Sequence, residues 1–211
     1  MDEAADARPR QASRLTTLPN LLGVARILAT PVVVVLMLTA FPGAGLAAFI
    51  VFALAAATDS LDGAIARARG QVSPLGIFLD LTADKVLVAG VLVAMVEVGL
   101  LPTWMVALLL IRELVVQGVR QVAATADVVI ASRAMGKGKT FAMLVVMGLL
   151  LLGFDAATGG PLSGLGGVGA LLQTTGYWVM VVATALSVAS GWDYVRAALP
   201  VLLGRPDEPP T

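Results

Sequence analysis

Long apolar runs separated by short polar segments are the main feature of this chain. Several of these runs approach the roughly 20 residues that an α-helix needs to cross the hydrocarbon core of a bilayer. Short turns rich in glycine and proline, such as FPGAG after Ala40, separate some of them. We therefore expect an all-α integral membrane protein with six transmembrane helices near Leu21–Ala40, Leu46–Ala66, Leu75–Val98, Pro102–Ala124, Phe141–Phe154 and Tyr177–Leu199.

The segments outside these runs predict the organisation of the chain. We expect the fifth helix to begin ahead of its apolar run, around Lys137. The Gly-rich segment DAATGGPLSGLGGVGALLQTTG that follows predicts a surface connector. The polar residues 1–15 predict a cytoplasmic head and the Pro-rich residues 201–211 a disordered tail, on either side of a six-helix membrane domain at 16–200.

Composition supports lipid as the solvent and narrows the possible chemistry. Of the 211 residues, 58% are hydrophobic and only 13% are charged, whereas a soluble domain carries about a quarter charged residues. The chain has no cysteine, which excludes disulfides and thiolate metal sites. It also has no histidine, the usual general base near neutral pH and the commonest zinc ligand. Acid–base or metal chemistry must therefore rest mainly on carboxylates.

The distribution of basic residues predicts the orientation. The connectors after the first, third and fifth runs contain no Lys or Arg, whereas the head, the tail and the other two connectors contain most of them. Because basic residues favour the cytoplasmic side, we expect both termini in the cytoplasm. Trp104 and Trp178 then lie near the outer membrane boundary, and Trp192 and Tyr194 near the inner one, at depths that aromatic residues favour.

Four aspartates stand close together at the cytoplasmic ends of the second and third runs. Asp59 and Asp62 are three residues apart, and Asp80 and Asp84 are four apart, so each pair shares one helix face. Four ionised carboxylates would repel one another strongly unless cations lay between them. Mg²⁺ and Mn²⁺ prefer oxygen ligands, and a two-metal cluster could clamp a diphosphate. A single aspartate could serve packing, ion pairing with Lys85 or an ion pathway, but four favour a functional site.

Neighbouring residues strengthen this interpretation. Gly63 would let a ligand approach the backbone closely, and Arg67, one turn further, could contact a phosphate. The pattern Asp59-x-x-Asp62-Gly63-x-x-Ala66-Arg67, eight residues, Gly76-x-x-x-Asp80-x-x-x-Asp84 resembles the signature of the CDP-alcohol phosphotransferases at every fixed position. The likeness extends from LPNLLGVARILATPVVVVLML to GKGKTFAMLVVMGLLLL. Within the family it is greatest to the members that make phosphatidylglycerophosphate, on stretches such as IRELVVQGVR and VVIASRAMGKGKT.

The resemblance implies six transmembrane helices, a cavity that faces the cytoplasm and a homodimer in the bacterial inner or plasma membrane, with no nucleic-acid partner. It implies that CDP-diacylglycerol and glycerol 3-phosphate react to give phosphatidylglycerophosphate and CMP. Asp59 and Asp80 would bridge two Mg²⁺ or Mn²⁺ ions, Asp62 would complete the first metal site and Asp84 the second. Asp84 would also be the general base. The CDP part of the donor would contact Gly63, Arg67 and Ser73.

An acceptor that carries a phosphate requires a cationic pocket. We hypothesise that Arg112 and Lys137 bind this phosphate, with support from Arg120, Arg133 and Lys139. The alternative is that such residues anchor the protein to anionic headgroups, which we favour for Arg133 and Lys139. Arg112 lies deeper in its run and precedes Glu113, so a site or a buried ion pair is expected there. Two polar residues at the start of the first run, Asn20 and Arg26, are lesser candidates for contact with the donor.

Three other functions fit part of the pattern. Another enzyme of the same family could use inositol phosphate, serine or phosphatidylglycerol as acceptor, with the same aspartates and a different cationic pocket. A cation-coupled transporter could use the aspartates as ion ligands, but such carriers often have two related halves and the acids here are confined to one hairpin. A membrane prenyltransferase also uses Mg²⁺ on a diphosphate, but Gly63 and Arg67 argue against it.

Overall fold

The computed structural model describes residues 17–39, 41–68, 74–125 and 136–203. The regular structure of these residues is helical, as the apolar runs predict. The fifth helix begins at Gly136, close to the position expected from the sequence. The elements are α1 Leu18–Thr39, α2 Ala44–Ala68, α3 Pro74–Glu97, α4 Thr103–Thr125, α5 Gly136–Ala157, the 3₁₀ helix η1 Pro161–Leu165 and α6 Val168–Leu202.

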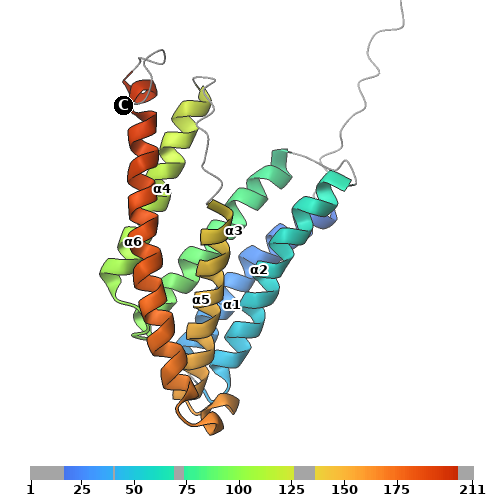
Figure 1. Ribbon diagram of the computed structural model, residues 1–211. Coiled ribbons are helices and arrows are strands. Elements are labelled where there is room, and N and C mark those ends of the chain that lie inside the picture. Colours follow the sequence, from blue (N-terminus) through green and yellow to red (C-terminus); the bar gives the residue numbers. More distant parts are fainter. Residues whose placement is uncertain (1–16, 40, 69–73, 126–135, 204–211) are drawn as a thin grey trace, which may run out of the picture.

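The helices converge at one end of the molecule and spread apart at the other (Figure 1). We call the end that holds η1 and the α1–α2 and α3–α4 turns the closed end. The opposite end, where α2, α4 and α6 finish and α3 begins, is the open end. The two turns contain Gly43 and Gly99 with φ of 95° and 75°, in the left-handed region that glycine adopts without strain. Gly43 of the predicted FPGAG turn and Gly99 of the VGLLP segment therefore serve the tight reversals.

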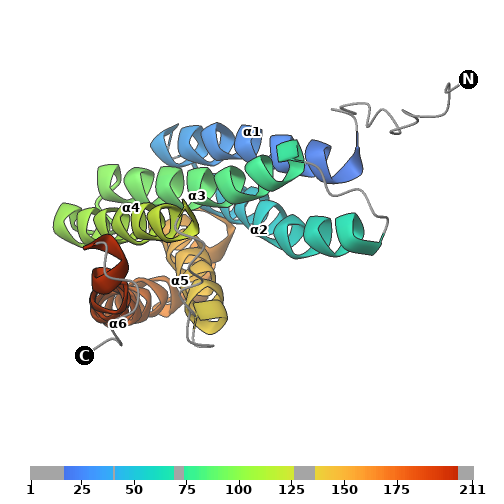
Figure 2. The ribbon, with the colours of Figure 1, turned by 90° about the horizontal axis from the view of Figure 1, so that it is seen from above.

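Two groups of helices meet around a shared core. Helix α1 packs against both α2 and α3, while α5 and α4 each pack against α6, and α2 joins the groups through α5 (Figure 2). The core lies among buried aliphatic residues and methionines, including Met37, Met95, Met105, Met147 and Met180. Methionine has a flexible, polarisable side chain that fills irregular gaps. These residues therefore act in packing.

The outer surface of the bundle is strongly apolar. Leu114 and Phe141 each expose 70% of their area, and many other large aliphatic side chains of α1 to α6 are half exposed. Contiguous apolar surface of this kind is unusual in a soluble monomer and suits lipid. By length and composition, α1 at Asn20–Thr39 and α6 at Val168–Pro200 can cross a membrane. Ala44–Thr58 and Phe141–Ala157 are shorter apolar stretches.

The segment before the sixth apolar run differs from the sequence-based expectation. The Gly-rich stretch was expected to be a surface connector throughout, but α6 begins at Val168 and continues through Gly176. A Cβ atom at Gly169 would lie 2.4 Å from the Cβ of Ala156, and one at Gly176 would lie 2.9 Å from Cδ2 of Leu150. These glycines therefore allow α6 to approach α5 closely, as small residues do between membrane helices. The glycine content reflects helix packing here, so the prediction of a loop was wrong for this part.

Candidate active site

The four aspartates lie on α2 and α3, in the parts of these helices nearest the open end. Asp59 and Asp62 are in the last three turns of α2, and Asp80 and Asp84 are in the first three turns of α3. The two helices are consecutive in the chain, and their joined ends lie on one side of the open end (Figure 1). In a helix, residues three or four apart share a face. The helical positions are those that the sequence predicts, whereas the roles of the aspartates remain predictions.

The described side chains of this group are Asp80, which is exposed, and Asp84, which is partly buried. Among the described side chains, no three acidic groups form a metal-binding cluster. The side chains of Asp59 and Asp62 lie outside the described residues. The donor set is nevertheless chemically suited to Mg²⁺ or Mn²⁺, because Asp80 and Asp84 offer hard carboxylate oxygens from successive turns of one helix. The surroundings of Gly63, the side chain of Arg67 and the whole of Ser73 also lie outside the described residues.

Helix α1 contributes a polar stripe beside this hairpin. Asn20 is 2% exposed near the start of the helix, and Arg26 (1%) and Thr30 (6%) share one helix face with the buried apolar residues Val33 and Met37. It lies where α1 packs on α2 and α3. A charged residue buried in an apolar bundle is costly, which makes Arg26 a candidate functional residue. Arg26 and Asn20 are therefore stronger candidates than their sequence context suggested.

A group of three charged residues connects α3 with α4. The carboxylate of Glu113 accepts a hydrogen bond from Lys85 Nζ of α3 and another from Arg112 Nη1, at 2.9 Å. All three side chains are partly buried. The sequence suggested that Lys85 pairs with an acid and that Arg112 serves a site or an ion pair. The structure identifies Glu113 as the shared partner of both.

Arg112 is also anchored to α6. Its Nε donates to the backbone oxygen of Ser187 at 3.3 Å. A Cβ atom added at Gly191 would lie 2.8 Å from Cγ of Arg112 and 3.3 Å from its Nε. The side chain of Arg112 therefore occupies space that only glycine leaves open. Sequence reasoning missed this role of Gly191, and its one local signal is the small-residue pair Ser190–Gly191 within the sixth helix.

The other predicted phosphate-binding cations are less well defined. Arg120 is exposed two turns beyond Arg112 on α4. Lys137 and Lys139 are in the first turn of α5, but their side chains lie outside the described residues. Arg133 lies wholly outside them. Among the described residues, Arg112 is thus the member of the predicted pocket with defined contacts.

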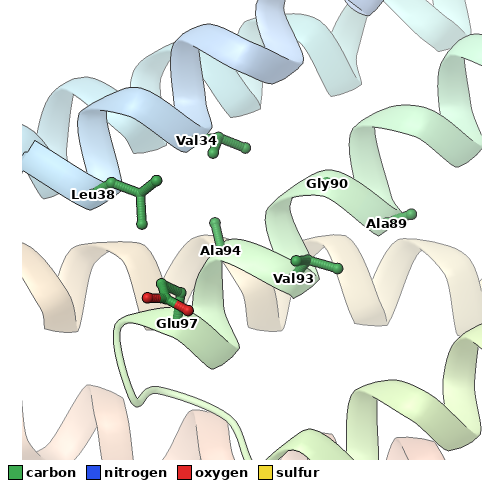
Figure 3. Close-up of a pocket in the computed structure, with 7 residues that line it drawn as sticks. All are labelled: Val34, Leu38, Ala89, Gly90, Val93, Ala94 and Glu97. Carbon is green, nitrogen blue, oxygen red and sulfur yellow. The ribbon is translucent and has the colours of Figure 1, made fainter.

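Two surface grooves differ in chemistry. One, of about 430 Å³ between α3 and α4, includes Lys85 together with the polar side chains of Thr82, Gln117 and Gln121. The other, of about 540 Å³ between α1 and α3, lies near the closed end (Figure 3). Apart from Glu97 at its edge, its lining is aliphatic: Val34, Leu38, Ala89, Gly90, Val93 and Ala94. This second groove lacks donors for a phosphate and lies away from the aspartates, so it does not belong to the candidate site.

Comparison with known proteins relates the chain to one family and to several enzymes. The family model described as CDP-alcohol phosphatidyltransferase matches residues 16–189, which include the four aspartates and Arg112. The chain is 36% identical over 192 residues to the CDP-diacylglycerol–glycerol-3-phosphate 3-phosphatidyltransferase of Bacillus subtilis, across 84% of this chain and 92% of that protein. It is 36% identical over 193 residues to a probable phosphatidylglycerophosphate synthase of Mycobacterium tuberculosis, across 89% of this chain and 84% of that protein. It is 32% identical over 214 residues to the CDP-diacylglycerol–glycerol-3-phosphate 3-phosphatidyltransferase of Cereibacter sphaeroides, across 88% of this chain and 97% of that protein.

Proposed function

The chain belongs to the CDP-alcohol phosphatidyltransferase family, and on that premise we propose that it transfers the phosphatidyl group of CDP-diacylglycerol to sn-glycerol 3-phosphate. The products are phosphatidylglycerophosphate and CMP. The observation that carries this proposal is the match over most of the chain to enzymes named for this reaction. The family is membrane-bound and generally depends on divalent metal ions, in agreement with the apolar exterior and the aspartate-rich hairpin.

The aspartates provide the chemistry of the proposed reaction. Asp59, Asp62, Asp80 and Asp84 would hold two Mg²⁺ or Mn²⁺ ions, which neutralise the charge of the donor diphosphate when bound. Asp84 takes the proton from the attacking hydroxyl of glycerol 3-phosphate. That oxygen then forms a bond to the phosphorus that carries diacylglycerol, and the bond from this phosphorus to the CMP oxygen breaks. Positioning and electrostatic stabilisation supply most of the catalysis.

Separate groups bind the two substrates. Gly63, Arg67 and Ser73 contact the CDP part of the donor, and the buried polar residues Asn20 and Arg26 of α1 support this side. The acceptor phosphate binds Arg112 and Lys137, with Arg120, Arg133 and Lys139 nearby. An arginine suits this purpose because its planar guanidinium can donate two parallel hydrogen bonds to one phosphate.

The open end faces the cytoplasm in this proposal, and the protein forms a homodimer in a bacterial plasma membrane. The closed-end segments 40–43, 98–102 and 158–167 contain no Lys or Arg, which favours the outer side for them. Residues 1–15 form a cytoplasmic head, 16–200 the catalytic domain and 201–211 a cytoplasmic tail. Arg196 lies 5.6 Å from the ring centroid of Trp192 on α6, a pairing suited to the inner membrane boundary.

A direct assay tests the proposed function. Purified protein in detergent is given CDP-diacylglycerol, a divalent cation and one radiolabelled water-soluble acceptor: glycerol 3-phosphate, inositol phosphate or serine. We expect labelled lipid and CMP with glycerol 3-phosphate only. Labelled lipid with another acceptor would assign a different reaction within the family. CMP formation in detergent, where no ion gradient exists, would exclude transport as the sole function.

A further inference from the structure

The contact that calls for a functional explanation lies midway along α4, where one carboxylate bridges two cations. Glu113 accepts hydrogen bonds from Lys85 of α3 and from its own neighbour Arg112. Two cations and one anion leave the group with a net charge of +1. Ionised side chains inside a membrane domain are costly and are retained mainly for function. A partly buried group with residual positive charge is suited to an anionic ligand.

The guanidinium of Arg112 is held from three directions before any ligand binds. Glu113 contacts Nη1 at 2.9 Å, the backbone oxygen of Ser187 contacts Nε at 3.3 Å, and Gly191 lies against the aliphatic part. A guanidinium has five N–H donors. These contacts among the described residues engage two of them, and three remain for a ligand. A side chain that is already ordered loses less conformational freedom on binding.

We propose that Glu113 is a positioning residue for the acceptor. It holds Arg112 and Lys85 so that their remaining N–H donors bind the phosphate of glycerol 3-phosphate, and Gly191 leaves the space that this conformation of Arg112 requires. Glu113 does not bind the phosphate itself, because both are anionic, but acts through the two cations. The inference rests on the proposed function, since it concerns the acceptor of that reaction.

The sign of one kinetic effect distinguishes positioning from simple charge balance. A carboxylate near a phosphate pocket repels the phosphate, so its removal by itself would lower the KM for the acceptor. If the carboxylate instead maintains the arrangement of Arg112 and Lys85, its removal raises that KM. Glu113→Gln keeps the shape of the side chain and removes only the charge. The direction of the change therefore separates the two roles.

The experiment measures steady-state kinetics of the full-length protein in detergent with CDP-diacylglycerol and glycerol 3-phosphate. For Glu113→Gln we expect the KM for glycerol 3-phosphate to rise by about tenfold to a hundredfold, the range that a misplaced binding group produces. The KM for CDP-diacylglycerol and kcat should stay within about twofold. Glu113→Asp, which retains the charge, should recover part of the loss. An unchanged or lowered acceptor KM in Glu113→Gln would overturn the proposal.

A second variant tests the same role without altering any charge. In Gly191→Ala the new Cβ displaces Arg112, and we expect the same rise in acceptor KM. The matched control is Gly118→Ala on α4, where an added Cβ meets no atom within 4 Å. Glu97→Gln, at the far end of α3, is the charge control. Both controls should keep the wild-type KM for glycerol 3-phosphate.

The outcomes separate this inference from the proposed function. If wild-type protein makes no phosphatidylglycerophosphate, the proposed function fails. If it does, but Glu113→Gln and Gly191→Ala leave the acceptor KM unchanged, only the positioning role fails. A third outcome is that both variants lower kcat and the unfolding temperature together, without a selective change in the acceptor KM. In that case the three charged residues only stabilise the fold, and the positioning role also fails.

Discussion

The backbone N–H of Leu46, near the start of α2, donates a 3.0 Å hydrogen bond to Oδ1 of Asp155, near the end of α5. The second carboxylate oxygen accepts a 3.1 Å hydrogen bond from the backbone N–H of Leu162 in η1. Asp155 is fully buried. It therefore satisfies two backbone donors that no intrahelical carbonyl reaches, and it joins three segments at the closed end. The structure therefore gives Asp155 a stabilising role.

Asp155→Ala is expected to destabilise the protein without a selective effect on either substrate. Each buried N–H left without an acceptor costs about 1–3 kcal/mol, and this variant leaves two. Asp155→Asn retains one carbonyl oxygen and should lose less. The measurement is the midpoint of thermal unfolding in detergent. Glu97→Ala, which removes an exposed carboxylate, serves as control, and equal midpoints for the two alanine variants would contradict the role of Asp155.

Gly45→Ala is expected to destabilise the same junction, against the usual preference for alanine in helices. An added Cβ would lie 2.4 Å from the backbone nitrogen of Asp155 and 2.6 Å from its Cα, so backbone must move. Alanine normally stabilises a helix interior by about 1 kcal/mol relative to glycine. At Gly164, where an added Cβ has open space, alanine should be tolerated. A Gly45→Ala variant as stable as Gly164→Ala would show that the closed end can relax.

Asp84→Asn is expected to reduce turnover by about a hundredfold or more, because it removes both a proposed metal ligand and the proposed general base. The rate of CMP release measures the loss, and the unfolding temperature should remain near that of wild type. Asp193→Asn, at an exposed position of α6, is the matched control. Chelation of divalent cations should stop the wild-type reaction, and added Mg²⁺ or Mn²⁺ should restore it. Activity that persists in the chelator would argue against the metal site.

Arg112→Ala should raise the KM for glycerol 3-phosphate by about tenfold or more, because hydrogen bonds to charged groups contribute about 1.5–3 kcal/mol. The KM for CDP-diacylglycerol should change far less. Arg112→Lys keeps the charge but loses the planar guanidinium, so its acceptor KM should lie between those of wild type and Arg112→Ala. Arg196→Ala removes a surface arginine of α6 and is the control. Unchanged acceptor kinetics in Arg112→Ala would remove this residue from the pocket.

Single cysteines test the proposed orientation, because the natural chain contains none. Ser163→Cys lies in η1 at the closed end, and Leu203→Cys lies just after α6 at the open end; both positions are exposed. In intact cells, a membrane-impermeant maleimide should label Ser163→Cys only. Leu203→Cys should react after the membrane is permeabilised. The reverse pattern would invert the topology.

The sequence determined the helices and the chemistry available to them. In lipid a backbone must satisfy its hydrogen bonds internally, so an apolar run of about 20 residues predicts a helix almost regardless of its partners. The spacing of Asp59, Asp62, Asp80 and Asp84 is equally local, because one hairpin contains all four. The absence of histidine and cysteine then left carboxylates as the main groups for metal or acid–base chemistry.

Tertiary structure alone decided which polar groups meet across different helices. Lys85 reaches Glu113 across 28 residues, and Asp155 binds the backbone of Leu46 across 109. A helix surrounded by lipid and apolar protein carries hydrophobic residues on every face, so its sequence shows little amphipathic pattern from which its rotation could be inferred. Close approach fixes that rotation instead, through positions such as Gly191 beside Arg112 and Gly169 beside Ala156. A single sequence does not distinguish such glycines from those of a loop, because the difference lies in the neighbouring helix.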